Sequence, residues 1–210
     1  ELPLLDIKSS ENVRFERNQF SISKKRWDNF CKTAKKFGVT PTSAVMTAYG
    51  MVIGRWSKNK SFCLNLSILN RLELHPQIGT VVGDFTASSL LEMEHKAGYS
   101  FKDIALQINR QLFDDLDHRL FTGVNVLREI QQRKKAAIMP YVFTGAIGLI
   151  SPEKSNLIGK MNNNGISQTP QVFMDCQAMD TIEGLNINID SRTGVFPDGV
   201  VNDICNTLHN

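Results

Sequence analysis

The sequence predicts one α/β unit in which a mixed sheet is backed by helices. Two periodicities support this prediction. Apolar residues recur every three or four positions in segments such as 24–37, as in an amphipathic helix, whereas apolar and polar residues alternate in segments such as 61–69, as in a strand. The two kinds of segment are interspersed without strict strand–helix–strand alternation, which favours a sandwich of sheet and helices. A length of 210 residues suits a single unit of this kind.

Residues 13–23 are expected to form the first strand, and residues 24–37 the first helix. Ser23 is a suitable N-cap for that helix, and Gly38 is a suitable stop. The apolar face of the helix is formed by Trp27, Phe30, Cys31, Ala34 and Phe37. Its lysines then fall on the opposite face, in water.

A second helix is predicted to begin directly afterwards. Thr40 can cap it, and Pro41 suits the first helical position, where a missing N–H has no partner to lose. Residues 44–56 are apolar almost all round, so we expect this helix to be buried. The strand at 61–69 places Asn65 on the face opposite its large apolar residues. Asn65 is either a hydrogen-bonded structural amide or a functional group.

Three further helices are expected in the rest of the chain. Ser100 and Asp103 have the spacing of a capping box at a helix start. Thr122 can cap a helix that runs to about Lys135, and Pro197 is expected to open the last helix.

Four more extended segments complete the predicted sheet. They lie at 89–93, 139–150, 169–179 and 185–189. The last two are expected to pair around a turn at Asp180–Gly184, and residues 75–83 have the composition of a loop.

The composition argues against several classes of function. The net charge is only +3, from 24 basic and 21 acidic residues, whereas nucleic-acid-binding domains usually carry a larger, clustered surplus. No apolar run approaches the roughly 18 residues of a membrane span, and the first residues lack the order of a signal peptide. We therefore expect no nucleic-acid partner and no membrane association. The acidic first residue and the absent Met indicate a fragment of something longer.

Neither a metal site nor a common nucleotide-binding or hydrolase motif is predicted. The 4 cysteines and 4 histidines are scattered, without zinc-ligand spacing. Free thiols of this kind are typical of a reducing, cytoplasmic compartment. The acidic run at 114–118 and the basic runs at 55–60 and 128–135 are interpreted as solvated helix faces and ends.

Three polar residues stand inside apolar segments that are expected to be extended. They are Asp84, Thr144 and Asp175. A carboxylate in a strand interior is costly unless it is hydrogen-bonded or poised for reaction. Each is therefore a candidate functional residue, and a structural role is the alternative for each.

The segments around these residues form a series of motifs. In chain order they are Leu2-Pro3-Leu4-Leu5, Thr40-Pro41-Thr42-Ser43-Ala44 continuing to Arg55-Trp56, Phe62-Cys63-Leu64-Asn65-Leu66 with Asn70-Arg71 and His75-Pro76, Gly83-Asp84-Phe85-Thr86, Pro140-Tyr141-Val142-Phe143-Thr144-Gly145, and Ser167-Gln168-Thr169-Pro170-Gln171-Val172 through Asp175. The series resembles that of the heterocyclization domains of nonribosomal peptide synthetases, a branch of the condensation-domain superfamily. It covers nearly the whole chain.

The chain departs from the family pattern in a few places. The D-x-x-x-x-D motif of the family's N-terminal lobe has no counterpart, so residues 1–210 resemble a C-terminal lobe with the N-terminal lobe absent. Ile189-Asp190 stands where W-D is usual, and Gly145 stands where Ser is common. These departures leave two alternatives open: an ordinary condensation lobe that forms only an amide, and a catalytically degenerate lobe that serves for docking.

The resemblance implies a fold, a reaction and partners. The fold is a chloramphenicol-acetyltransferase-like lobe, two of which form a V around a tunnel. The reaction condenses an acyl thioester with a cysteinyl, seryl or threonyl thioester and then cyclodehydrates the product to a thiazoline or oxazoline. No cofactor is bound directly, because both substrates ride on the phosphopantetheine arms of upstream and downstream carrier proteins. An adenylation domain is expected nearby, and the isolated chain is expected to be inactive.

The resemblance also implies roles for individual residues. Asp175 is the expected acid–base residue, and Thr144 is expected to position it or the leaving water. Asn65 and Gln171 are candidate substrate-binding residues, whereas Asp84 is assigned a structural or supporting role. If these assignments hold, Thr144, Asp175 and Asn65 must share one cleft. Its apolar wall is expected to consist of Val142, Phe143, Val172 and Phe173.

Overall fold

A computed structural model describes residues 2–6, 13–94, 98–133, 138–149, 165–166 and 169–210. Within these ranges the chain forms a six-stranded sheet in the order β1-β6-β5-β4-β2-β3. The strands are β1 (Phe15–Ser23), β2 (Ser61–Leu69), β3 (Thr86–Glu94), β4 (Tyr141–Ala146), β5 (Met174–Thr181) and β6 (Gly184–Arg192). The β2–β4 and β4–β5 pairs are parallel and the other pairs are antiparallel, which confirms the predicted mixed sheet.

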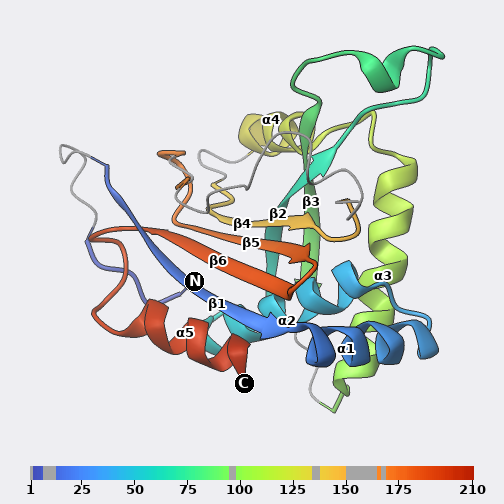
Figure 1. Cartoon of the computed structure of the whole chain (residues 1–210). Helices are drawn as coiled ribbons and strands as arrows, with labels where there is room; N and C mark the ends of the chain where they lie inside the picture. The colour runs from blue at the N-terminus through green and yellow to red at the C-terminus, as the bar shows by residue number, and fades with distance from the viewer. Residues whose placement is uncertain (1, 7–12, 95–97, 134–137, 150–164, 167–168) are drawn as a thin grey trace.

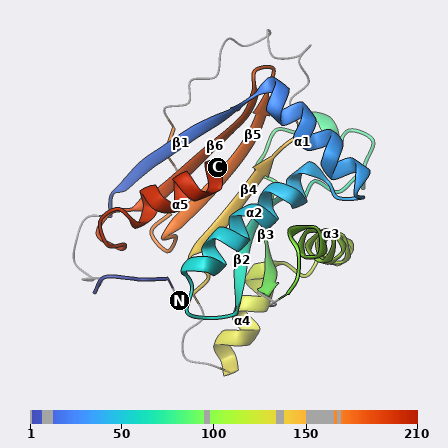
Figure 2. The same ribbon diagram turned by 90° about the horizontal axis from the view of Figure 1, so that it is seen from below.

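The helices back this sheet, as predicted. They are α1 (Lys24–Lys36), α2 (Pro41–Trp56), α3 (Phe101–Asp117), α4 (Gly123–Arg133) and α5 (Val200–His209), with a short 3-10 turn at Ile78–Thr80. Helices α1, α2 and α5 lie on one face of the sheet, as Figures 1 and 2 show from two sides. Helix α3 packs beside α2, and α4 packs on β3.

The core fills the space between the sheet and helices α1, α2, α3 and α5. Its fully buried members include Met46, Tyr49, Ile53, Leu64, Leu91, Met174, Cys176, Leu185, Ile187, Ile189 and Ile204. Leu64 and Leu66 of β2 point into it, while Asn65 between them faces the other side, as the alternation predicted. Burial of each large aliphatic side chain stabilises the fold by about 1.5–3 kcal/mol, so this face anchors the sheet.

Two of the predicted helix starts carry the expected caps. The Thr40 hydroxyl accepts a hydrogen bond from the backbone N–H of Ser43 at 3.1 Å. The Ser100 hydroxyl accepts from the N–H of Asp103 at 3.3 Å, and Asp103 accepts from the N–H of Ser100 at 3.0 Å, which completes the capping box. The hydrogen bonds from Ser100 lower the pKa of the Asp103 carboxyl. Ser23 precedes α1 as predicted, but its side chain makes no capping hydrogen bond.

Two predicted boundaries were wrong near the C-terminal end. The last helix begins at Val200 and not at Pro197, because Gly199 at its N-cap has a left-handed backbone with φ 84°. The strand expected from residue 169 begins only at Met174. Residues 169–172 instead form a turn closed by a 2.9 Å hydrogen bond from the N–H of Val172 to the carbonyl of Thr169. Pro170 cannot donate to a sheet ladder, which suits it to that turn.

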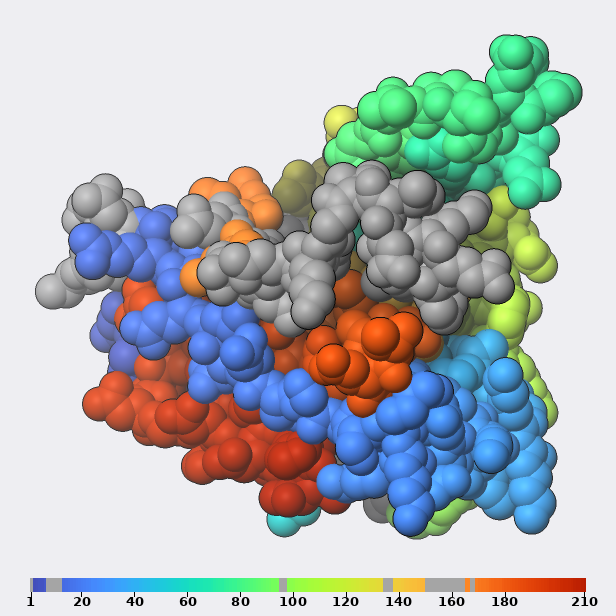
Figure 3. All heavy atoms as spheres, in the orientation of Figure 1, coloured from blue at the N-terminus to red at the C-terminus, as the bar shows by residue number. Residues whose placement is uncertain are grey.

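The connection between β2 and β3, residues 70–85, projects from the body of the molecule. Figures 1 and 3 show it as an arm at the top right. Arg71 organises the arm: its guanidinium donates to the carbonyls of Ile78 at 2.6 Å and Val81 at 2.8 Å, and lies 3.9 Å from the centre of the Phe85 ring. Even so, Leu74 is 84% exposed and Val82 is 99% exposed.

Candidate functional site

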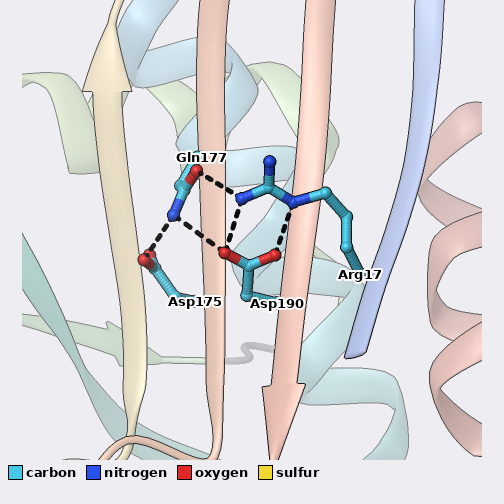
Figure 4. A network of polar contacts seen from close by, with 4 residues as sticks. All are labelled: Arg17, Asp175, Gln177 and Asp190. Carbon is cyan, nitrogen blue, oxygen red and sulfur yellow. Dashed lines mark hydrogen bonds and ion pairs between the residues drawn. The ribbon is translucent and has the colours of Figure 1, made fainter. Parts of the chain in front are cut away.

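A row of polar side chains crosses the sheet on the face opposite the core. In β5, Asp175 is the register partner of Asp190 in β6, and Asp190 is the partner of Arg17 in β1. Residues paired in this way point to the same face of a sheet. Figure 4 shows Asp175, Gln177, Asp190 and Arg17 meeting there from three strands, and Thr144 extends the row onto β4.

Asp175 is held from two sides. The Thr144 hydroxyl donates to its Oδ1 at 3.3 Å, and Nε2 of Gln177 donates to its Oδ2 at 2.9 Å. The predicted contact between the Thr144 hydroxyl and the Asp175 carboxylate is therefore confirmed. Asp175 is only 6% exposed, so its carboxylate lies in a partly dry environment in which proton transfer can be tuned.

Asp190 is the most deeply buried carboxylate of the row, with no exposed area. It forms a bidentate ion pair with Arg17, with Nε to Oδ1 at 2.6 Å and Nη2 to Oδ2 at 2.7 Å. Gln177 connects this pair to Asp175, because its Nε2 also donates to Oδ2 of Asp190 at 3.2 Å. The hydrogen bond to Asp190 raises the pKa of Arg17 further above its usual value, so the guanidinium remains charged.

The row ends at an open hollow of about 560 Å³. Its walls come from β2, β3, β4, the start of β5, the turn at 169–172 and the residues at the start of α4. Thr144, Asp175, Asn65 and Asp84 all line it. The prediction that Thr144, Asp175 and Asn65 share one cleft is therefore confirmed. A carboxylate beside a hydroxyl on the wall of such a hollow can accept a proton from a bound molecule and return it.

The apolar wall of the hollow was predicted only in part. Val142 and Val172 line it. Phe143 lies in the core at 3% exposure, with its ring 6.1 Å from that of Tyr49, and Phe173 also packs against the core. The assignment of these two phenylalanines to the wall was wrong, because neighbours along an extended chain point to opposite sides.

Gln171 and Asp84 lie less centrally. Gln171 is exposed in the turn at 169–172 and is not among the residues that line the hollow, so its substrate-binding role remains a prediction. Asp84 lies outside β3, although it was expected within a strand, and its Oδ1 accepts from the N–H of Thr86 at 2.8 Å. Hydrogen bonds from Thr86 lower the pKa of Asp84. This contact caps the start of β3, which is the structural role proposed for Asp84.

Three residues of the row were not predicted as site residues: Arg17, Gln177 and Asp190. Gln177 had a detectable signal, since it stands two positions after Asp175 and so on the same strand face. Asp190 was considered only as part of the Ile189-Asp190 pair, which stands where W-D is usual. Ile189 has no exposed area and belongs to the core. The departure from W-D therefore lies in the core, on the face of the sheet opposite the polar row.

Gly145, where the family commonly has Ser, lies where a side chain does not fit. A Cβ at this position would lie 2.9 Å from Cγ2 of Thr42 and 3.1 Å from Cε1 of Phe143. We expect Gly145→Ser to destabilise the 210-residue chain by about 1–3 kcal/mol in urea unfolding, because an overpacked site forces its neighbours to move. Thr42→Ser removes the closest methyl group and should restore part of the loss.

Gly79 provides the matched control for this substitution. A Cβ at Gly79 meets nothing within 4 Å, and its backbone is not left-handed. Gly79→Ser should change the unfolding free energy by less than about 0.5 kcal/mol. Equal unfolding midpoints for the two serine variants would contradict the packing explanation of Gly145.

Other kinds of site find no support in the part of the chain that the structure describes. Within it, no group of three or more His, Cys, Asp or Glu side chains is placed to hold a metal ion. No helix among the described residues is long and apolar enough to cross a membrane. Cys31, Cys63, Cys176 and Cys205 are free thiols, and burial raises the pKa of each. They are thus poorly suited to act as nucleophiles.

Comparisons with known proteins identify the family of the chain. The family model described as "Condensation domain" matches residues 1–210. Pyochelin synthetase PchF of Pseudomonas aeruginosa is 41% identical over 206 residues, which are 95% of this chain and 11% of that protein. Phenyloxazoline synthase MbtB of Mycobacterium tuberculosis is 33% identical over 171 residues, which are 80% of this chain and 12% of that protein. The chain thus spans only a small part of these curated relatives.

A solved structure supports the same fold. The EpoB cyclization-docking bidomain of a nonribosomal peptide synthetase from Sorangium cellulosum superposes with a TM-score of 0.85 at 28% identity. The match covers 99% of this chain and 43% of that one. The condensation-domain fold implied by the sequence motifs is therefore confirmed.

Proposed function

Because the chain belongs to the condensation-domain family, we propose that it supplies the acid–base residues of a heterocyclization site in a nonribosomal peptide synthetase. The observation that carries this proposal is the hydrogen bond between Thr144 and Asp175 on the wall of the hollow. The names of the relatives support it: one is a phenyloxazoline synthase, and the solved structure is of a cyclization bidomain.

The proposed reaction has two stages. First, the amine of a carrier-bound Cys, Ser or Thr attacks the upstream acyl thioester, forms an amide and releases the thiol of the upstream phosphopantetheine arm. Next, the side-chain thiol or hydroxyl attacks the new amide carbonyl and closes a five-membered ring. The former carbonyl oxygen then leaves as water, which leaves a C=N bond in the ring.

Asp175 is assigned the proton transfers of the second stage. The departing water carries two protons, one from the attacking thiol or hydroxyl and one from the amide nitrogen. Asp175 accepts each proton and delivers it to the oxygen, acting as base and acid in turn. The Thr144 hydroxyl, hydrogen-bonded to Oδ1, is placed to orient that carboxylate and the departing oxygen. Asn65, two strands away from Asp175 on the same face of the sheet, is assigned to bind the amide of the substrate.

A second lobe is proposed to close the hollow. Large apolar side chains, including Leu74 and Val82 of the arm at 70–85, are exposed on this chain. Such surfaces usually mark a protein–protein contact. We assign the contact to the N-terminal lobe of the same domain, with residues 1–210 as the C-terminal lobe. Carrier proteins would deliver both substrates to the cleft between the lobes, in the cytoplasm and next to an adenylation domain.

The test is product analysis with the whole synthetase that contains this domain. Both carriers are loaded, one with an acyl group and the other with Cys, Ser or Thr, and the products are identified by mass spectrometry. A thiazoline or oxazoline is expected from the synthetase, and no product from the 210-residue chain alone, although that chain should fold. Linear amide as the sole product would indicate an ordinary condensation domain. The absence of both products would indicate a docking lobe.

A further inference from the structure

We propose that Gln177, Asp190 and Arg17 are positioning residues, which fix the orientation and the proton affinity of Asp175. This inference rests on the proposed function, because it assigns these residues to the proton transfers of ring closure. None of them is among the residues that line the hollow, so they act through Asp175.

The sheet places two carboxylates side by side. Asp175 and Asp190 are register partners on adjacent strands, and both are less than 9% exposed. Two like charges at this spacing repel each other, so the negative charge of Asp190 disfavours the ionised form of Asp175. Arg17 compensates Asp190 through its bidentate contact. Its charge also reaches Asp175, which contributes to the raised pKa of Arg17. The balance of these charges therefore sets how readily Asp175 takes up a proton.

Gln177 fixes which oxygen of Asp175 faces the substrate. Its Oε1 accepts from Nη2 of Arg17 at 3.4 Å, while its Nε2 donates to the two aspartates. The reversed amide would set an oxygen against two carboxylates and a nitrogen against a guanidinium, so only one orientation is favourable. Oδ2 of Asp175 thus accepts from an amide N–H. Oδ1 lies at Thr144 on the wall of the hollow, where protons are exchanged with the substrate.

Charged and titratable groups from several elements surround Asp175 and can affect its protonation. Asp190 and Arg17 face it from β6 and β1, and Asp84 lies on the same hollow. From the core side, Tyr49 of α2 and the neighbouring Cys176 also interact with it. Burial holds the pKa of both of these groups well above their usual values, so they stay neutral in the working range. The test therefore removes the charge of Asp190 in one variant and adds a charge at the neutral neighbour Gln177 in another.

Two substitutions in the whole synthetase should move the pH dependence of ring closure in opposite directions. Gln177→Glu places a second carboxylate beside Asp175, in addition to Asp190, so the acid limb of the pH–rate profile should shift to higher pH by about 1–3 pH units. Asp190→Asn removes a negative charge and leaves Arg17 as an uncompensated cation. This charge balance favours the ionised form of Asp175, so the acid limb of the profile should shift to lower pH by about 1 pH unit or more. Amide formation should keep its profile in both variants.

The matched control is Asn186→Asp in β6. Asn186 lies on the same face and strand as Asp190, about 13 Å away at the usual rise per residue, and accepts a hydrogen bond from Ser21. The Asn186→Asp substitution adds the same charge as Gln177→Glu. It should leave the acid limb of the pH–rate profile within a few tenths of a pH unit of its wild-type position. Circular dichroism establishes that each variant is folded. Gln177 is half-buried, so its variant should fold even where Asp190→Asn does not.

The outcomes separate this inference from the proposed function. If Gln177→Glu folds and closes the ring with the wild-type pH profile, or shifts it no more than Asn186→Asp, the positioning role is wrong and the row is only structural. If the wild-type synthetase forms no heterocycle, the proposed function fails and this inference fails with it. An upward shift confined to Gln177→Glu supports the positioning role, and a downward shift in a folded Asp190→Asn variant strengthens it.

Discussion

Asp175→Ala in the whole synthetase is expected to lower the rate of ring closure by about 10²–10⁴-fold, while linear amide accumulates. Dehydration expels a poor leaving group and depends on a positioned acid. Amide formation starts from an activated thioester and a good amine nucleophile, so it needs less acid–base help. Mass-spectrometric time courses of the linear and cyclised products measure both stages in one experiment.

Asp180→Ala is the control for this substitution. Asp180 is a carboxylate near the other end of β5, and its Oδ1 accepts from the backbone N–H of Gly148 at 2.9 Å. It does not line the hollow, so its variant should keep both rates near the wild-type values. If Asp175→Ala slows amide formation and ring closure equally, Asp175 has a structural role.

Asp190→Ala is expected to destabilise the 210-residue chain by about 3–5 kcal/mol, measured by urea unfolding. The substitution leaves the Arg17 guanidinium, whose side chain is only 11% exposed, without the bidentate partner that offsets its desolvation. It also removes one acceptor of the Gln177 amide.

An exposed ion pair on the same chain gives the comparison. Lys24 and Asp28 of α1 lie 2.5 Å apart with about half of each side chain in water, at 55% and 45% exposure. Asp28→Ala should cost less than about 1 kcal/mol, because solvent screens exposed charges. A loss for Asp190→Ala as small as that for Asp28→Ala would show that water reaches the Arg17 pair.

Most of the fold could be predicted because its signals are local. The alternation in β2 and the capping residues Thr40, Ser100 and Asp103 each determine structure within a few positions. The errors arose where a local signal was ambiguous. Pro197 can open a helix or precede one, and Gly199 decided between these.

Only those site residues could be predicted that stand out within their own strand. Asp175 and Thr144 stood out as polar residues in apolar segments. Arg17 did not, since its role depends on the strand order that brings β1 beside β6 and joins residues 173 positions apart. Neither periodicity nor composition carries that pairing information, and many lysines and arginines in the chain have equally ordinary local sequences.

The alternation of core-facing and row-facing side chains along β5 also limits which insertions and deletions this strand tolerates. Met174, Cys176 and Ala178 point into the core, while Asp175 and Gln177 point to the polar row. Deleting one codon between the start of β5 and Gln177 would invert this phase, turning an acid toward the hydrophobic interior and a thiol or thioether toward the hollow. Natural selection should therefore act against single-residue insertions and deletions in β5.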